Sequence, residues 1–145
     1  MIMTGLTVAL AACGRGADAT DARAVTVDVI GDDFNWYFKY AGADGQAGTP
    51  DDQTSVRHLY LPANTQITLN LHSKDYLYSF ALPDFGQSSV AVPDLDYSVS
   101  FQTGDPGTYA LRGDQFCGFS HETLLGEVRV GRPKDTAFAQ LFAHD

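Results

Sequence analysis

Apolar and polar residues alternate with a period of two along much of the chain, and this periodicity constrains the fold more than any other feature. In residues 25–40 the alternating apolar positions fall in two runs, Val25, Val27 and Val29, then Phe34, Trp36, Phe38 and Tyr40. Successive side chains of a β-strand point to opposite faces of a sheet, so each run places one apolar face on a core. We expect residues 25–40 to form two strands or one bent strand.

Three further segments show the same alternation. Residues 58–73 alternate on both sides of Pro62, residues 96–113 predict two strands around the turn GDPG, and residues 124–131 end the pattern with LLGEVRVG. A helical pattern is confined to the tail, residues 132–145, where KDTAFAQLFAHD favours a short helix. The segments together predict an all-β sandwich.

Length and charge limit the classes of protein to consider. A chain of 145 residues allows one domain with a core of its own. The net charge is −9, and the chain has only nine Lys and Arg residues. Nucleic acid binding needs clustered basic residues, so this class of partner is excluded. A basic protein is the better electrostatic match.

The first residues have the pattern of an export signal. Residues 1–12 are largely apolar and end in small residues directly before Cys13. This arrangement is typical of a lipoprotein signal peptide, with the lipid, and so the membrane anchor, on Cys13. Residues 13–23 are polar and rich in Gly and Ala, as expected of a flexible tether, which leaves residues 24–131 as the domain. A buried first strand or helix is the alternative, and no Lys or Arg precedes the apolar run.

The segment QFCGFSH places Cys117 and His121 four residues apart. If Cys13 carries a lipid, Cys117 has no disulfide partner. It is then either a small buried apolar residue or bound to another group, such as a metal. His121 is then either a metal ligand or a residue hydrogen-bonded to the backbone.

A second candidate site lies in the Gly-rich insertion AGADGQAGTPDDQ. Its carboxylates, Asp44, Asp51 and Asp52, offer oxygen ligands for calcium. Their spacing does not match the EF-hand loop, and a solvated turn is the alternative interpretation.

The order of motifs resembles that of a known family. The segments LPANTQITLNLHSKD, YSFALPDFGQSSVAVPD and GTYALRGDQFCGFSH follow the aromatic segment at residues 34–40. Together they resemble the copper-A domain of cytochrome c oxidase subunit II, from about Val25 to Val130. The resemblance implies a cupredoxin-like Greek-key β-sandwich.

The resemblance also implies where copper ligands would stand. The family's final loop has Cys, three residues, Cys, three residues, His, two residues, Met, and another His lies upstream in a His-Ser-Phe/Trp motif. Without gaps, these positions are Gly113, Cys117, His121 and Leu124, with Tyr78 upstream. Only Cys117 and His121 match. The binuclear centre of the family needs two bridging thiolates, so we expect it to be absent.

Other positions depart from the family in the same way. The Glu between the two Cys residues is replaced by Gln115, and the Trp-x-Trp pair is replaced by Phe34 and Trp36. The family assigns the first of those tryptophans to electron uptake. The resemblance therefore leaves that role open here, and a position in the core is the alternative for Trp36.

Three functions follow as hypotheses. The first is a copper-A-deficient accessory or docking subunit of a haem-copper oxidase-like complex, comparable with subunit II of quinol oxidases, with a basic redox partner such as cytochrome c. The second is a mononuclear copper carrier, which requires two His and one Cys around the metal. Neither His58 nor His72 matches a ligand position, and His144 lies in the tail. The third is a β-sandwich binding module outside respiration. No pattern for catalysis by the chain alone is present.

Overall fold

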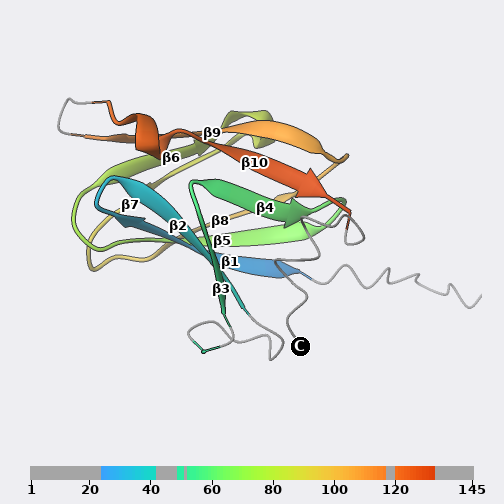
Figure 1. The fold of residues 1–145 in the computed structure, drawn as a ribbon, viewed down its shortest axis with the longest axis horizontal. Coiled ribbons are helices and arrows are strands. Elements are labelled where there is room, and N and C mark those ends of the chain that lie inside the picture. The colour runs from blue at the N-terminus through green and yellow to red at the C-terminus, as the bar shows by residue number, and fades with distance from the viewer. Residues whose placement is uncertain (1–23, 42–48, 51, 117–119, 133–145) are drawn as a thin grey trace, which may run out of the picture.

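Two five-stranded sheets pack face to face in the computed structural model, which describes residues 24–41, 49–50, 52–116 and 120–132 (Figure 1). The first sheet has the order β3-β2-β1-β5-β8. Its strands are β1 (Val25–Asp32), β2 (Asn35–Tyr40), β3 (Gln53–Val56), β5 (Gln66–Ser73) and β8 (Tyr97–Gln102). The second sheet has the order β4-β10-β9-β6-β7. Its strands are β4 (His58–Pro62), β6 (Tyr78–Leu82), β7 (Gln87–Ala91), β9 (Gly107–Gln115) and β10 (Gly126–Gly131).

Two short 3-10 turns, η1 (Pro83–Phe85) and η2 (Glu122–Leu124), complete the described elements. Neighbouring strands pair antiparallel, except that β1 lies parallel to β5 and β10 lies parallel to β4. The predicted all-β sandwich of the cupredoxin-like kind is thus confirmed. In the part of the chain that the structure describes, no helix is long and apolar enough to cross a membrane.

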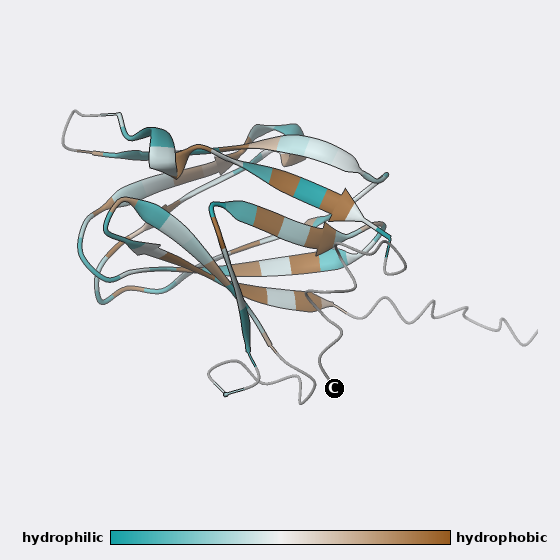
Figure 2. Ribbon diagram, in the orientation of Figure 1, coloured by the Kyte–Doolittle hydropathy of each residue, from teal (hydrophilic) through white to brown (hydrophobic). Residues whose placement is uncertain are grey.

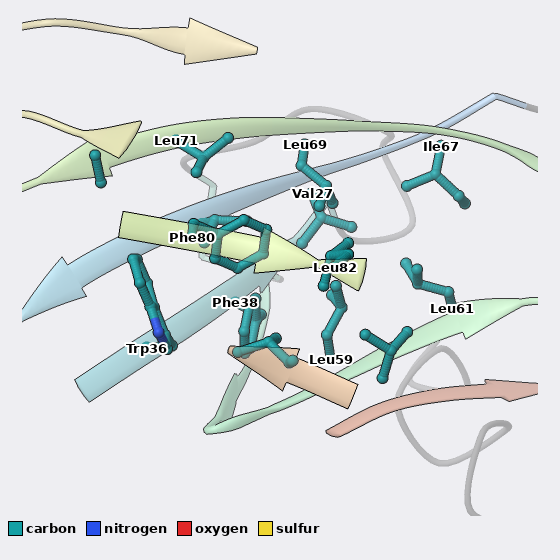
Figure 3. Packing of buried hydrophobic residues seen from close by; sticks show 14 of the residues in the cluster. Val27, Trp36, Phe38, Leu59, Leu61, Ile67, Leu69, Leu71, Phe80 and Leu82 are labelled. Atoms are coloured by element: carbon teal, nitrogen blue, oxygen red, sulfur yellow. The ribbon is translucent and has the colours of Figure 1, made fainter. Parts of the chain in front are cut away.

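The core lies between the sheets and follows the alternation of the sequence. Figure 2 shows apolar and polar positions alternating along β1, β4, β5 and β10. Trp36, Phe38 and Tyr40 are almost completely buried, so the prediction that they belong to the core is confirmed. Figure 3 shows Phe38 of the first sheet and Leu59 of the second within the same packed cluster.

Residues 25–40 form two strands joined by a tight hairpin. Asp32 pairs with Asn35, so only Asp33 and Phe34 form the loop. Both have positive φ, 48° and 59°. Two consecutive residues of this kind form a type I′ turn, whose twist fits an antiparallel pair. A positive φ is unfavourable for the bulky Phe34, so other contacts must hold it there.

Strands β3, β6 and β7 were not predicted from the alternation. They are short, and β6 and β7 are separated only by η1 and its C-cap residue Gly86, which has φ 64°. The predicted signal peptide over residues 1–12, the tether over 13–23 and the helix within 132–145 fall outside the described residues, apart from Arg132.

Candidate functional site

Three segments meet at one end of the sandwich, on the left in Figure 1. They are the hairpin loop Asp33–Phe34, the loop 74–77 before β6, and the segment 120–125 that contains η2. Contacts between β2 and η2 join the first and third of these segments. We refer to this region as the hairpin end. It contains the sequence-predicted positions Phe34, Tyr78, Leu124 and His121.

Tyr78 is fully buried, and its hydroxyl takes part in two hydrogen bonds. The hydroxyl donates to Asp75 Oδ1 at 2.7 Å and accepts from the backbone N–H of Phe34 at 3.2 Å. Burial raises the pKa of Tyr78 well above its ordinary value, and the hydrogen bond to Asp75 raises it further. The phenol is therefore neutral at pH 7.

The carboxylate of Asp75 joins the hairpin to the loop before β6. Besides the Tyr78 hydroxyl, it accepts from the backbone N–H groups of Asp33 at 2.7 Å and Tyr76 at 2.8 Å. Burial acts to raise the pKa of Asp75, but the hydrogen bonds from Tyr78, Asp33 and Tyr76 outweigh it and lower the pKa below its usual value. An ionised carboxylate thus stabilises the strained hairpin loop.

The indole of Trp36 lies against Gly113 and crosses toward the segment 120–125. Its Nε1–H donates to the backbone oxygen of Leu124 at 3.2 Å. A β-carbon on Gly113 would lie 2.5 Å from Trp36 Nε1 and 2.9 Å from the Leu124 oxygen. The φ of Gly113 is not positive, so lack of space, not backbone conformation, favours Gly here.

Gly31 makes room for Tyr78 in a similar way. A β-carbon at Gly31 would lie 2.5 Å from Cδ2 of the Tyr78 ring. Sequence analysis missed this residue, although a clue was present. Gly31 continues the inward positions of Val27 and Val29 without a side chain, and a Gly at such a position often marks the close approach of another group.

The segment 120–125 is joined to the rest of the domain by burial of Leu124 and by side-chain hydrogen bonds. Leu124 is fully buried. Arg57 donates through Nε to the Leu125 oxygen at 2.9 Å and through Nη2 to the Glu122 oxygen at 3.2 Å. Thr123 donates its hydroxyl to the Phe34 oxygen. The two Arg57 bonds satisfy backbone carbonyls of the segment, and the Thr123 bond satisfies the carbonyl of Phe34 in the hairpin loop.

Arg57 is itself in an unusual conformation. It links β3 to β4, has φ 70°, and donates its backbone N–H to the Trp36 oxygen at 2.8 Å. A β-carbon at Gly126 would lie 1.9 Å from the Arg57 oxygen, so Gly126 allows this approach. Sequence analysis missed Arg57, because no motif marks an isolated Arg as a loop anchor.

His121 stacks on Phe34, with ring centroids 4.0 Å apart and planes 23° apart. Tyr76 also stacks on Phe34, with ring centroids 5.0 Å apart and an angle of 19° between the ring planes. Tyr78 meets Phe34 edge to face at 6.4 Å. His121 and Tyr78, both ligand positions in the resemblance, are therefore brought to the same ring.

The remaining predicted positions are distributed differently. Gln115 ends β9 and pairs in register with Tyr78, whereas Cys117 lies outside the described residues. Asp52 accepts a hydrogen bond from the Thr49 hydroxyl at 3.2 Å, as in a turn. Asp44, Asp51, Cys13 and His144 also lie outside the described residues.

Two other histidines, His58 and His72, fall in the described part of the chain. His72 Nδ1 lies 2.6 Å from Asp96 Oδ1 on the first sheet, and His58 begins β4. Burial lowers the pKa of His58, and the nearby charge of Arg129 lowers it further. Among the described residues, no group of three or more His, Cys, Asp or Glu side chains is arranged to hold a metal ion.

The sequence matches the family model described as cytochrome c oxidase subunit II, periplasmic domain, over residues 48–129. It is 30% identical over 109 residues to the haem-copper oxidase subunit 2 of Aeropyrum pernix, covering 74% of this chain and 44% of that protein. It is 29% identical over 111 residues to the cytochrome c oxidase subunit 2 of Thermostichus vulcanus, covering 77% of this chain and 31% of that protein. The chain thus spans less than half the length of these relatives.

The fold has solved counterparts. The periplasmic domain of subunit II of cytochrome oxidase from Bradyrhizobium japonicum superposes with a TM-score of 0.64 at 21% identity, covering 80% of this chain and 88% of that chain. At this identity the likeness concerns the fold alone. The family model, in contrast, spans more than half of the sequence and runs from before β3 into β10. The chain therefore belongs to the family of the periplasmic domain of cytochrome c oxidase subunit II.

Proposed function

We propose that the chain is an exported, extracytoplasmic domain that serves a haem-copper oxidase-type complex as a copper-A-deficient accessory or docking subunit. Membership of the subunit II family and the names of its relatives support the respiratory context and the location outside the cytoplasm. The proposed anchor is a lipid on Cys13. The net charge of −9 suits a basic redox partner, such as a cytochrome c.

The contact between Trp36 and Gly113 is the observation that supports the loss of copper most directly. The resemblance places the first bridging thiolate at position 113, and there the indole leaves no space for a β-carbon. At the upstream ligand position, the Tyr78 hydroxyl is bonded to Asp75 and to the Phe34 backbone. Both observations support the proposal that the binuclear copper centre is lost.

The segment 120–125 supports the same proposal, because hydrogen bonds within the protein hold it in place. Arg57 and Trp36 donate hydrogen bonds to backbone oxygens of the segment, and Thr123, within it, donates to the Phe34 oxygen. A surface that is pre-formed by protein contacts is suited to docking, since little ordering remains to be done on binding.

Copper analysis combined with co-purification tests this function. The full chain is expressed with a C-terminal tag in a copper-supplemented host that also produces the oxidase subunits. We expect haem-containing subunits in the eluate and copper well below one ion per chain. Two coppers per chain would contradict the loss of copper-A.

Two other outcomes favour the alternative functions. One copper per chain that disappears in a Cys117→Ser or His121→Ala variant would favour the mononuclear carrier. Absence of both copper and oxidase subunits would favour a binding module outside respiration. Retention of the variant by the same resin serves as the control for expression, and urea denaturation of the eluted variant serves as the control for folding.

A further inference from the structure

Three oxidisable rings form a path from the core to the surface at the hairpin end. The ring centroids of Trp36 and Tyr78 are 5.6 Å apart, and those of Tyr78 and Tyr76 are 6.4 Å apart. Trp36 and Tyr78 are fully buried, whereas Tyr76 is 44% exposed. Indole and phenol rings can each give up one electron, and these separations are those of direct ring contact.

The central ring has a proton acceptor in place. The Tyr78 hydroxyl donates to Asp75 Oδ1 at 2.7 Å, and Asp75 is ionised at neutral pH. A phenol that loses an electron becomes a strong acid, so a carboxylate at hydrogen-bond distance lets the proton leave together with the electron. Asp75 is exposed, so water reaches the carboxylate while it holds that proton.

We propose that Trp36, Tyr78 and Tyr76 form a route along which an oxidising equivalent leaves the core of the domain, with Asp75 as the proton acceptor of Tyr78. A strong one-electron oxidant, such as an oxygen-centred radical, first takes one electron from Trp36 and is itself reduced to the anion. Tyr78 then gives one electron to the oxidised indole, and its phenolic proton moves to Asp75 Oδ1. A neutral tyrosyl radical remains beside a neutral carboxylic acid.

Tyr76 completes the transfer. It gives one electron to the Tyr78 radical, Asp75 returns its proton to the Tyr78 oxygen, and the Tyr76 hydroxyl releases its own proton to water. A one-electron reductant in the solvent, such as a thiolate or ascorbate, then reduces the Tyr76 radical, which recovers a proton from water. Over the sequence one electron passes from reductant to oxidant, and each residue returns to its starting state.

The route requires no bound copper, so its test is independent of the test of the proposed function. It gives Tyr78 a role besides packing, because a phenylalanine would fill the same volume without the hydroxyl. It also gives Asp75 a role besides holding the hairpin loop.

Flash photolysis tests the route, since Trp36 is the single tryptophan of the chain. A laser flash at the red edge of the protein absorption ionises the indole selectively, and an electron scavenger removes the ejected electron. In the wild type we expect the absorbance of the indole radical to decay as that of a tyrosyl radical rises. Tyr78→Phe should slow this decay about tenfold or more and lower the tyrosyl yield.

Other variants separate the steps. Tyr76→Phe should leave the first transfer unchanged but prolong the life of the Tyr78 radical. Asp75→Asn should slow the first transfer and weaken its dependence on heavy water. Tyr97→Phe removes a tyrosine that is 39% exposed and lies outside the path, so it should change nothing.

The same decay and tyrosyl yield in folded Tyr78→Phe and wild type would overturn the route. Urea denaturation establishes whether that variant is folded. If it is not, the Asp75→Asn variant decides, because its carboxylate lies at the surface. An unchanged transfer rate and an unchanged heavy-water effect in Asp75→Asn would likewise overturn the route.

Discussion

The indole of Trp36 closes the space above Gly113, so that Nε1 would lie 2.5 Å from any β-carbon there. Gly113→Ala should therefore destabilise the domain by about 1–3 kcal/mol, the usual cost of adding a methyl group to a packed core. Gly113→Cys should cost at least as much. Urea denaturation followed by fluorescence of Trp36 measures both variants.

Gly104→Ala is the matched control, because a β-carbon at Gly104 would meet nothing within 4 Å and its φ is not positive. It should be neutral or slightly stabilising, since Ala restricts the unfolded chain more than Gly. Equal stability of Gly113→Ala and Gly104→Ala would show that Trp36 can move away from Gly113 at little cost.

Asp75 should make part of the stability depend on pH. Its pKa is lowered on folding, so its contribution is present above the unfolded pKa of about 3.9 and is lost as pH falls through the folded pKa. Asp75→Asn should be less stable than wild type at neutral pH, and the difference should shrink below about pH 4. Urea denaturation over a pH series measures this difference.

Asp105→Asn, at an exposed turn, controls for the removal of one negative charge. Its difference from wild type should stay small throughout the series. A difference for Asp75→Asn that is constant from neutral to acid pH would mean that the ionised form of Asp75 does not support the hairpin loop.

Arg57→Ala should loosen the segment 120–125. The variant loses the two side-chain bonds to the carbonyls of Glu122 and Leu125, and we expect a loss of about 1–3 kcal/mol. Hydrogen exchange of the Leu124 and Leu125 amides should become faster, while strand β5 keeps its protection. Arg112→Ala, an exposed Arg on β9, is the control. Equal exchange in both variants would contradict the anchoring role of Arg57.

Cys13 should decide attachment to the membrane if it carries the lipid. A Cys13→Ser variant should move from the membrane fraction to the soluble periplasmic fraction, because the acyl chains are the proposed anchor. Immunoblots of the two fractions measure this, and a Cys117→Ser variant controls for the loss of a thiol. Equal distribution of Cys13→Ser and wild type would contradict lipid anchoring.

The alternation of side chains predicted the strands that contribute long apolar faces, but not the hairpin end. Val27, Val29 and Phe38 could be placed in a core from spacing alone, since period two requires it. The close contact between Gly31 and the Tyr78 ring depends on how β1, in one sheet, packs against β6, in the other. Local spacing carries no information about which strands face each other, so this contact could not be derived.

The resemblance supplied the positions Tyr78, Gly113 and Leu124 but not the reason for each residue. Gly113 could have been explained by a positive φ, and the structure shows instead that Trp36 occupies the space. Besides Gly31, sequence analysis also missed Asp75 and Arg57. Each acts on backbone groups that are distant in the chain, and such bonds leave no periodic pattern.

The place of the last strand has a consequence for the order of folding. Strand β10 lies in the interior of its sheet, between β4 and β9. The second sheet therefore cannot close until the C-terminal strand has left the ribosome or the translocation pore. Pairings so distant in sequence are slow to form, on the order of milliseconds to seconds in β-sandwiches. Until then the edges of β4 and β9 that will pair with β10 remain open, and open strand edges favour pairing with other chains.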